Sequence, residues 1–118
     1  MRKIFLLAMI SILVLTVPAP AFAHAFLDRA EPRVGNTVQS PPRELKLWFT
    51  QKLEQAFSTV TVTDASGQRV DTGKPRVSDN QMTVSLRTVG PGTYRVNWHV
   101  LSVDTHTTDG NFTFSVGK

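Results

Sequence analysis

The segment TYRVNWHVLSV, residues 93–103, alternates apolar and polar side chains over most of its length. Alternation with a period of two predicts a β-strand that buries one face and exposes the other. The apolar face consists of every second residue from position 94: Tyr94, Val96, Trp98 and Val100. His99 lies on the opposite face between polar neighbours, so we expect a solvated surface histidine rather than a metal ligand or a gating group.

The same alternation recurs in shorter segments before and after this strand. Further strands are predicted at residues 44–50 (ELKLWFT), 57–63 (FSTVTVT), 68–72, 82–86 and 111–116. Gly, Pro, Asp and Asn residues separate these segments at spacings near ten residues, and a single helical turn at 51–56 is the most helix that we expect. About seven short strands with such turns predict an all-β fold, a Greek-key immunoglobulin-like β-sandwich.

The N-terminal segment has the layout of a secretory signal peptide. Arg2 and Lys3 form a basic head, residues 4–17 form an apolar run, and an Ala-Phe-Ala motif ends at Ala23. The apolar run is shorter than the roughly 20 residues of a membrane-spanning helix. Cleavage after Ala23 would remove residues 1–23 from the 118 and leave an exported domain of 95 residues, 24–118.

Composition excludes several classes of function. The chain has 13 basic and 9 acidic residues, and loss of Arg2 and Lys3 with the signal peptide leaves a mature charge of about +2. With no basic run, this pattern does not fit a nucleic-acid partner. The sequence contains no cysteine, which excludes disulfides, a thiolate nucleophile and zinc–thiolate sites. The charged side chains of Lys46, Arg69 and Lys74 are expected at sheet edges, in keeping with a monomer.

Asp104 and His106 form the first candidate site. They are two residues apart at the end of the predicted strand, so in an extended segment both side chains project from the same face. A Thr-Asp-Gly turn is expected directly afterwards, at residues 108–110. The pair alone is a weak signal, because an aspartate that caps the backbone beside an exposed histidine has the same pattern.

His24 strengthens the case for a metal site, because cleavage after Ala23 would make it the first residue of the mature protein. An N-terminal histidine offers its α-amine and its imidazole to the same ion, and both groups can lose their protons to a metal at neutral pH. Together with His106 and Asp104 this gives three nitrogens and one oxygen. Such a donor set favours one tetragonal Cu(II) ion.

The mature sequence resembles the CopC family of periplasmic copper-binding proteins over essentially its whole length. The most specific matches are His24 followed by Pro32, the segment PGTYRVNW at 91–98, and the S-x-D-x-H-x-x-x-G pattern of Ser102, Asp104, His106 and Gly110. The resemblance implies a periplasmic Cu(II)-binding protein in copper resistance or homeostasis. It also implies His24, Asp104 and His106 as the ligands, and an inner-membrane copper transporter of the CopD type as partner.

Two departures from the family pattern limit this inference. Some members place a glutamate after the second strand, where this chain has Gln51, which cannot supply a carboxylate but can orient a water molecule. Other members carry a methionine-rich loop for Cu(I), whereas the only methionine after the leader, Met82, fits a core position. The chain therefore resembles the members with a single Cu(II) site.

Two other functions remain open from the sequence. A histidine brace also serves copper oxygenases that cleave polysaccharides, but these need an open position for dioxygen, which Asp104 is placed to occupy. A sandwich of this size can also be a metal-free interaction module. The prediction is accordingly a copper-binding protein that is not an enzyme.

Overall fold

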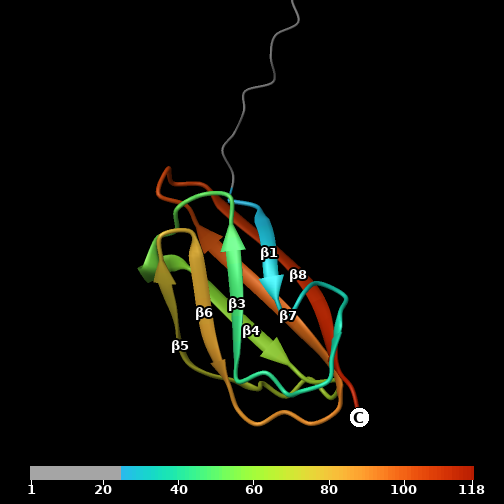
Figure 1. The fold of residues 1–118 in the computed structure, drawn as a ribbon. Helices are drawn as coiled ribbons and strands as arrows, with labels where there is room; N and C mark the ends of the chain where they lie inside the picture. Colours follow the sequence, from blue (N-terminus) through green and yellow to red (C-terminus); the bar gives the residue numbers. More distant parts are fainter. Residues whose placement is uncertain (1–24) are drawn as a thin grey trace, which may run out of the picture.

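The computed structural model describes residues 25–118, which form two four-stranded sheets packed face to face (Figure 1). One sheet has the order β1-β3-β6-β5, with bounds Leu27–Glu31, Glu44–Phe49, Gln81–Leu86 and Asp71–Ser78. The other has the order β2-β8-β7-β4, with bounds Thr37–Val38, Thr107–Val116, Gly92–Leu101 and Thr59–Thr63. The chain crosses between the sheets repeatedly, which confirms the predicted all-β sandwich.

Most predicted strands are present, with two additions. Strands β1 and β2 were not predicted, because neither segment alternates over enough residues to give a period-two signal. The only helical element among the described residues is a 3-10 turn, η1, at Gln55–Phe57, close to the single turn expected at 51–56. In this part of the chain, no helix is long and apolar enough to cross a membrane. The predicted signal peptide and His24 lie outside the described residues.

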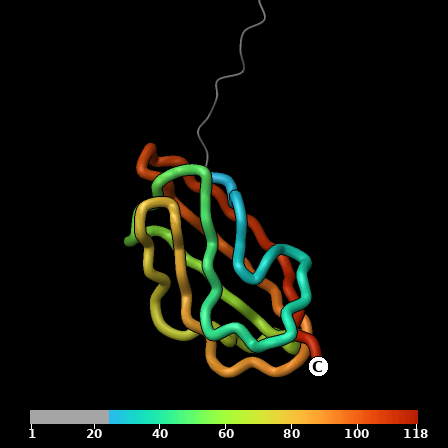
Figure 2. Tube along the Cα trace, viewed as in Figure 1, coloured from blue at the N-terminus to red at the C-terminus, as the bar shows by residue number. Residues whose placement is uncertain are grey.

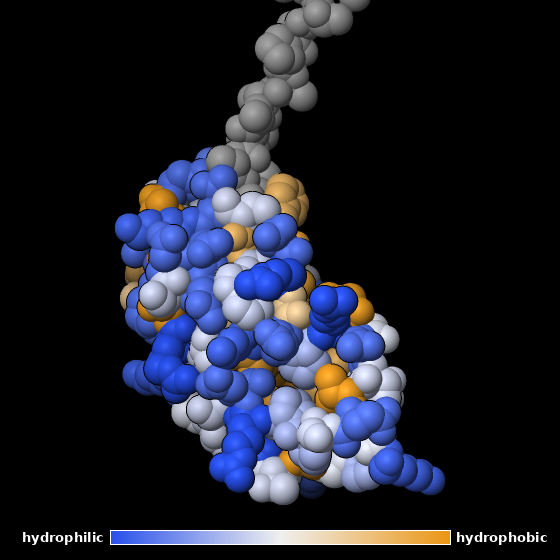
Figure 3. All heavy atoms as spheres, in the orientation of Figure 1, coloured by the Kyte–Doolittle hydropathy of each residue, from blue (hydrophilic) through white to orange (hydrophobic). Residues whose placement is uncertain are grey.

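Both sheets direct alternate side chains into one core, as the sequence pattern predicted. The residues of β3 and β7 that face inward are buried: Leu45, Leu47, Phe49, Tyr94, Val96, Trp98 and Val100. Met82 on β6 is fully buried in the same core, which confirms its predicted place there. The space-filling view in Figure 3 shows the consequence on one face of the molecule, which is mainly hydrophilic with scattered apolar residues.

Of the charged side chains predicted at sheet edges, not all lie on an edge strand. Lys74 lies on β5, an edge strand, but Lys46 lies on β3, which β1 and β6 flank on both sides. Arg69 forms an ion pair with Asp71, whose carboxylate is almost completely buried, at 2.6 Å. The same carboxylate accepts a hydrogen bond of 2.8 Å from the N–H of Val62 on the opposite sheet. The Asp71 carboxylate therefore joins the two sheets at one edge.

The predicted turn at residues 108–110 is wrong. These residues belong to β8 and pair with β7, Gly110 lying opposite Trp98. The Trp98 ring covers Gly110 so closely that an added Cβ would lie 2.5 Å from Cζ2 of the indole. The ring also packs edge-on against Phe49, with 5.2 Å between ring centroids. Glycine is present here because the indole needs the space, rather than because the chain turns.

Replacing Gly110 with alanine should therefore destabilise the sandwich. The added methyl group meets a ring that packs against Phe49 in the core, so we expect a loss of about 1–3 kcal/mol in the free energy of unfolding. Urea denaturation followed by tryptophan fluorescence measures it. The control is Gly90→Ala, where an added Cβ meets nothing within 4 Å. Equal stability of the Gly110 variant and the wild type would contradict the packing argument.

Candidate metal centre

A tight turn between β7 and β8 carries two of the three predicted ligands. The N–H of Ser102 donates to the carbonyl of His106 at 2.9 Å, and the N–H of Thr105 donates to the carbonyl of Ser102 at 2.9 Å. Thr105 adopts a left-handed backbone conformation with φ of 72°. Strand β7 thus ends at Leu101, not at residue 103 as predicted.

The turn brings Asp104 and His106 together. Oδ1 of Asp104 lies 3.4 Å from Nδ1 of His106, and both side chains are about two-fifths exposed. The predicted proximity is therefore present, although its predicted cause was wrong, because the residues lie on a turn rather than on an extended strand. Two such side chains, close together and both partly exposed, are suited to bind one ion.

Ser102 holds the carboxylate in place. Its side chain is fully buried, and its hydroxyl donates a hydrogen bond to Oδ1 of Asp104. The same Oγ lies 3.1 Å from the carbonyl oxygen of His106. The hydrogen bond from Ser102, followed by that from His106, lowers the pKa of Asp104 below its ordinary value. Because its pKa is lowered, protons compete less with a metal ion for this carboxylate.

The segment that follows β3 supports the turn from the other sheet. The N–H of Val103 donates to the carbonyl of Lys52 at 3.0 Å, and the N–H of Glu54 donates to the carbonyl of Leu101 at 2.8 Å. Gln51 is half-buried in this segment. The turn is therefore held between both sheets.

The described chain begins at the same end of the sandwich as the turn at residues 102–106, as the tube in Figure 2 shows. The hydroxyl of Thr108, two residues after His106, donates to the carbonyl of Ala25 at 2.6 Å. His24 itself lies outside the described residues. Within residues 25–118, no three histidine, cysteine, aspartate or glutamate side chains gather around one metal position. Asp104 and His106 thus form two parts of a site that needs a further donor.

His99 does not belong to this pair. Its side chain is exposed on the outer face of β7, and its Nδ1 lies 4.0 Å from Oδ2 of Asp109 on β8. Thr59 and Asp109 flank it in the register of the sheet. The prediction that His99 faces outward among polar residues is confirmed.

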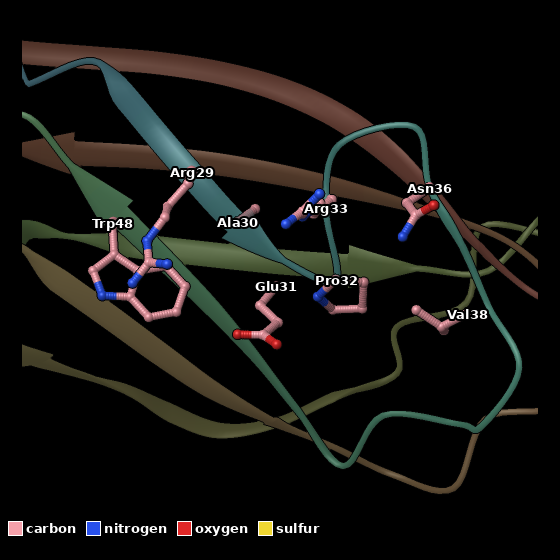
Figure 4. Close-up of a pocket in the computed structure, with 8 residues that line it drawn as sticks. All are labelled: Arg29, Ala30, Glu31, Pro32, Arg33, Asn36, Val38 and Trp48. Carbon is pink, nitrogen blue, oxygen red and sulfur yellow. The ribbon is translucent and has the colours of Figure 1, made fainter.

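A surface groove beside β1 offers a different chemistry. It has a volume of about 460 Å³ and lies between β1, Trp48 and the segment that leads to β2 (Figure 4). The guanidinium of Arg29 stacks on the Trp48 ring, 4.0 Å from the ring centroid. Among its lining residues are one carboxylate, that of Glu31, and no imidazole. This donor set is unsuited to a transition metal.

The fold and the site define a β-sandwich with a candidate metal centre at one end. The CopC domain model matches residues 27–117, so the chain belongs to the CopC domain family. Protein YobA of Escherichia coli K12 is 36% identical over 112 residues, which cover 91% of this chain and 90% of that protein. Copper resistance protein C of Xanthomonas campestris pv. juglandis is 35% identical over 107 residues, 83% and 84% of the two chains.

Other relatives differ in length or have solved structures. Copper transport protein CutJ of Bacillus subtilis is 34% identical over 106 residues, which cover 86% of this chain but only 20% of that protein. The crystal structure of CopC from Methylosinus trichosporium OB3b superposes with a TM-score of 0.75 at 29% identity, covering 80% of this chain and 94% of that one. PcoC of Escherichia coli, described as a methionine-rich copper resistance protein, gives 0.70 at 32%, covering 80% and 99%.

Sequence reasoning missed the supporting hydroxyl groups. Ser102 was part of the family motif, but no role was assigned to it, and Thr108 was not singled out. A hydroxyl residue two positions from a ligand was the available signal, since Ser and Thr readily bond to neighbouring backbone and side-chain groups. The partner of Thr108, Ala25, is 83 residues away in the sequence, so no local pattern could indicate it.

Removing the Ser102 hydroxyl should change the acidity of Asp104. In the metal-free Ser102→Ala variant we expect the pKa of Asp104 to rise towards its ordinary value, because its first hydrogen-bond donor is lost. Carboxyl-detected NMR titration measures this shift. Asp64, whose lowered pKa depends on Ser66, serves as an internal control that should stay constant. An unchanged Asp104 titration would show that Ser102 does not stabilise the carboxylate.

Proposed function

We propose that the mature protein is a periplasmic copper-binding protein that holds one Cu(II) ion through His24, Asp104 and His106. It serves as a copper carrier in copper resistance or homeostasis and not as an enzyme. Membership of the CopC domain family and the copper-related names of the relatives support this proposal. The signal-peptide pattern of residues 1–23, with cleavage after Ala23, supports the periplasmic location.

The observation that carries the proposal is the position of Ala25. Its carbonyl is bound to Thr108, two residues after His106, at 2.6 Å. His24 directly precedes Ala25 in the chain, and consecutive Cα atoms are only about 3.8 Å apart. The residue directly after His24 is therefore fixed on β8, two positions from His106 in the sequence, and cleavage after Ala23 would release the α-amine one residue before this contact.

The donor set indicates the oxidation state. His24 would supply its α-amine and imidazole, His106 a second imidazole and Asp104 a carboxylate, all borderline or hard donors that suit Cu(II). Cu(I) prefers thioether or thiolate ligands. The chain has no cysteine, and Met82 is fully buried in the core. Gln51, close to the turn, has no charge to contribute and would act through a water molecule.

The same geometry argues against an oxygenase. Such an enzyme needs an open equatorial position for dioxygen, whereas the Asp104 carboxylate lies beside His106 and is suited to occupy that position. The 102–106 turn is also short, so it does not build a broad face for a polymeric substrate. No observation on the described residues favours a metal-free interaction module over a copper site.

A membrane copper transporter of the CopD type is the partner that we propose. The relative CutJ, a copper transport protein, is about five times as long as the segment that this chain matches. A domain of this family thus occurs within a longer transport protein, which supports delivery from the sandwich to a transporter. The charge of Lys74 on the edge strand β5 supports a monomeric carrier, since charged edges oppose strand pairing between copies.

Adding one residue before His24 should weaken Cu(II) binding strongly. The extra residue converts the α-amine into an amide, which removes one donor and the chelate ring. Competition titration of the mature and the extended proteins against a chelator of known affinity measures the difference, which we expect to reach at least about 100-fold. Urea denaturation of both metal-free proteins is the control for folding. Equal affinities would refute the role of the N-terminus.

Alanine substitutions should rank three polar residues by their contribution to Cu(II) affinity: His106, Asp104 and His99. We expect His106→Ala to lower Cu(II) affinity by orders of magnitude and Asp104→Ala by less, because solvent can partly replace a carboxylate. His99→Ala should change little, since His99 lies outside the site. The same competition titration measures all three. A loss at His99 as large as that at His106 would contradict the assignment of the site.

A further inference from the structure

We propose that the hydroxyl groups of Thr50 and Thr108 form a two-sided clamp on the first residues of the mature chain, and that this clamp sets the Cu(II) affinity. The inference rests on the proposed function, because it assigns positioning residues to that same site. The clamp holds Ala25 and Phe26, the two residues that follow His24.

The first side of the clamp comes from β8. The hydroxyl of Thr108 donates to the carbonyl of Ala25 at 2.6 Å. Thr108 lies opposite the fully buried Val100 in the ladder that joins β7 and β8 along ten residue pairs. Because that ladder fixes the backbone of Thr108, its hydroxyl is a fixed anchor for the N-terminal segment.

The second side comes from the other sheet. Thr50 directly follows β3, and its Oγ1 accepts a hydrogen bond of 3.0 Å from the N–H of Phe26. The N–H of Thr50 in turn donates to the carbonyl of Phe26 at 2.9 Å. Three hydrogen bonds from two sheets therefore hold two consecutive residues.

These hydrogen bonds lie where no ladder holds the chain. Strand β1 begins at Leu27, so residues 25 and 26 precede the pairing of β1 with β3. Ala25 is nevertheless fully buried, which fixes its position further. The threonine hydroxyls thus continue the anchoring of the chain from β1 up to the residue next to His24.

Anchoring matters because a flexible chelating terminus loses conformational entropy when it binds a metal ion, and this loss lowers the affinity. A free peptide that begins with histidine must lose backbone freedom to bring its donors to a second imidazole. In the clamped chain, residues 25 and 26 lose this freedom during folding, so copper binding does not have to order them. Without one of the hydroxyl groups the donor atoms would be the same, but their common position would be less populated.

The experiment compares conservative variants of the mature protein that begins at His24. Thr108→Val keeps the shape and removes the hydroxyl, and Thr108→Ser keeps the hydroxyl. Thr50→Val tests the opposite side of the clamp. The matched control is Thr93→Val, because the Thr93 hydroxyl bonds that of Ser115 at 3.1 Å, near the opposite end of the β7–β8 ladder. Cu(II) affinity is measured by chelator competition, and metal-free stability by urea denaturation.

We expect Thr108→Val to weaken Cu(II) binding about tenfold, a change typical of one lost hydrogen bond, and Thr50→Val to weaken it similarly. Thr108→Ser should restore the affinity to within about twofold of the wild type, and Thr93→Val should leave it unchanged. Electron paramagnetic resonance should report the same donor atoms in all of these variants, since no ligand is altered.

Unchanged Cu(II) affinity in both valine variants at positions 50 and 108 would overturn the clamp. Lower metal-free stability with unchanged affinity would overturn it too, because the hydroxyls would then only support the fold. Failure of serine to rescue position 108 would have the same meaning. If the wild type itself fails to bind Cu(II), the proposed function fails instead, so the two failures are distinguishable.

Discussion

The buried hydroxyl and main chain of Ser102 close the turn on which the candidate site depends. The N–H of Ser102 and its Oγ both lie within hydrogen-bonding distance of the His106 carbonyl, and the hydroxyl also binds the Asp104 carboxylate. A fully buried polar group must find partners inside the protein, because unsatisfied burial is costly. Here the partners of Ser102 are the two residues whose side chains form the site.

The β7–β8 ladder gives this turn a rigid base. The two strands pair from Gly92 opposite Val116 to Leu101 opposite Thr107, directly below the turn. The Trp98 ring, packed over Gly110 and against Phe49, joins this ladder to the other sheet. Site residues carried by such a packed scaffold vary little in position, which favours a defined metal geometry over a flexible one.

The fold also brings the N-terminal segment of the domain into contact with its C-terminal strand, β8. The N-terminal segment meets β8 at Thr108, across 83 residues of sequence, and meets β3 at Thr50. Under the proposed function, export and assembly of the site are then a single process, because removal of residues 1–23 would create an amine donor beside residues that the fold has already positioned. The precursor would fold to the same sandwich without having the complete donor set.

The sequence by itself determined the sandwich class, the inward and outward faces of β3 and β7, and the candidate residues Asp104 and His106. These depend on local periodicity and residue type, which a single chain displays directly. Only the tertiary structure decided that Thr108–Gly110 is strand rather than turn, that Asp104 and His106 meet on a tight turn, and that Thr50 and Thr108 hold Ala25 and Phe26. Each of these depends on contacts between distant segments, and packing between such segments overrides the local preference of a Thr-Asp-Gly or Asp-x-His pattern.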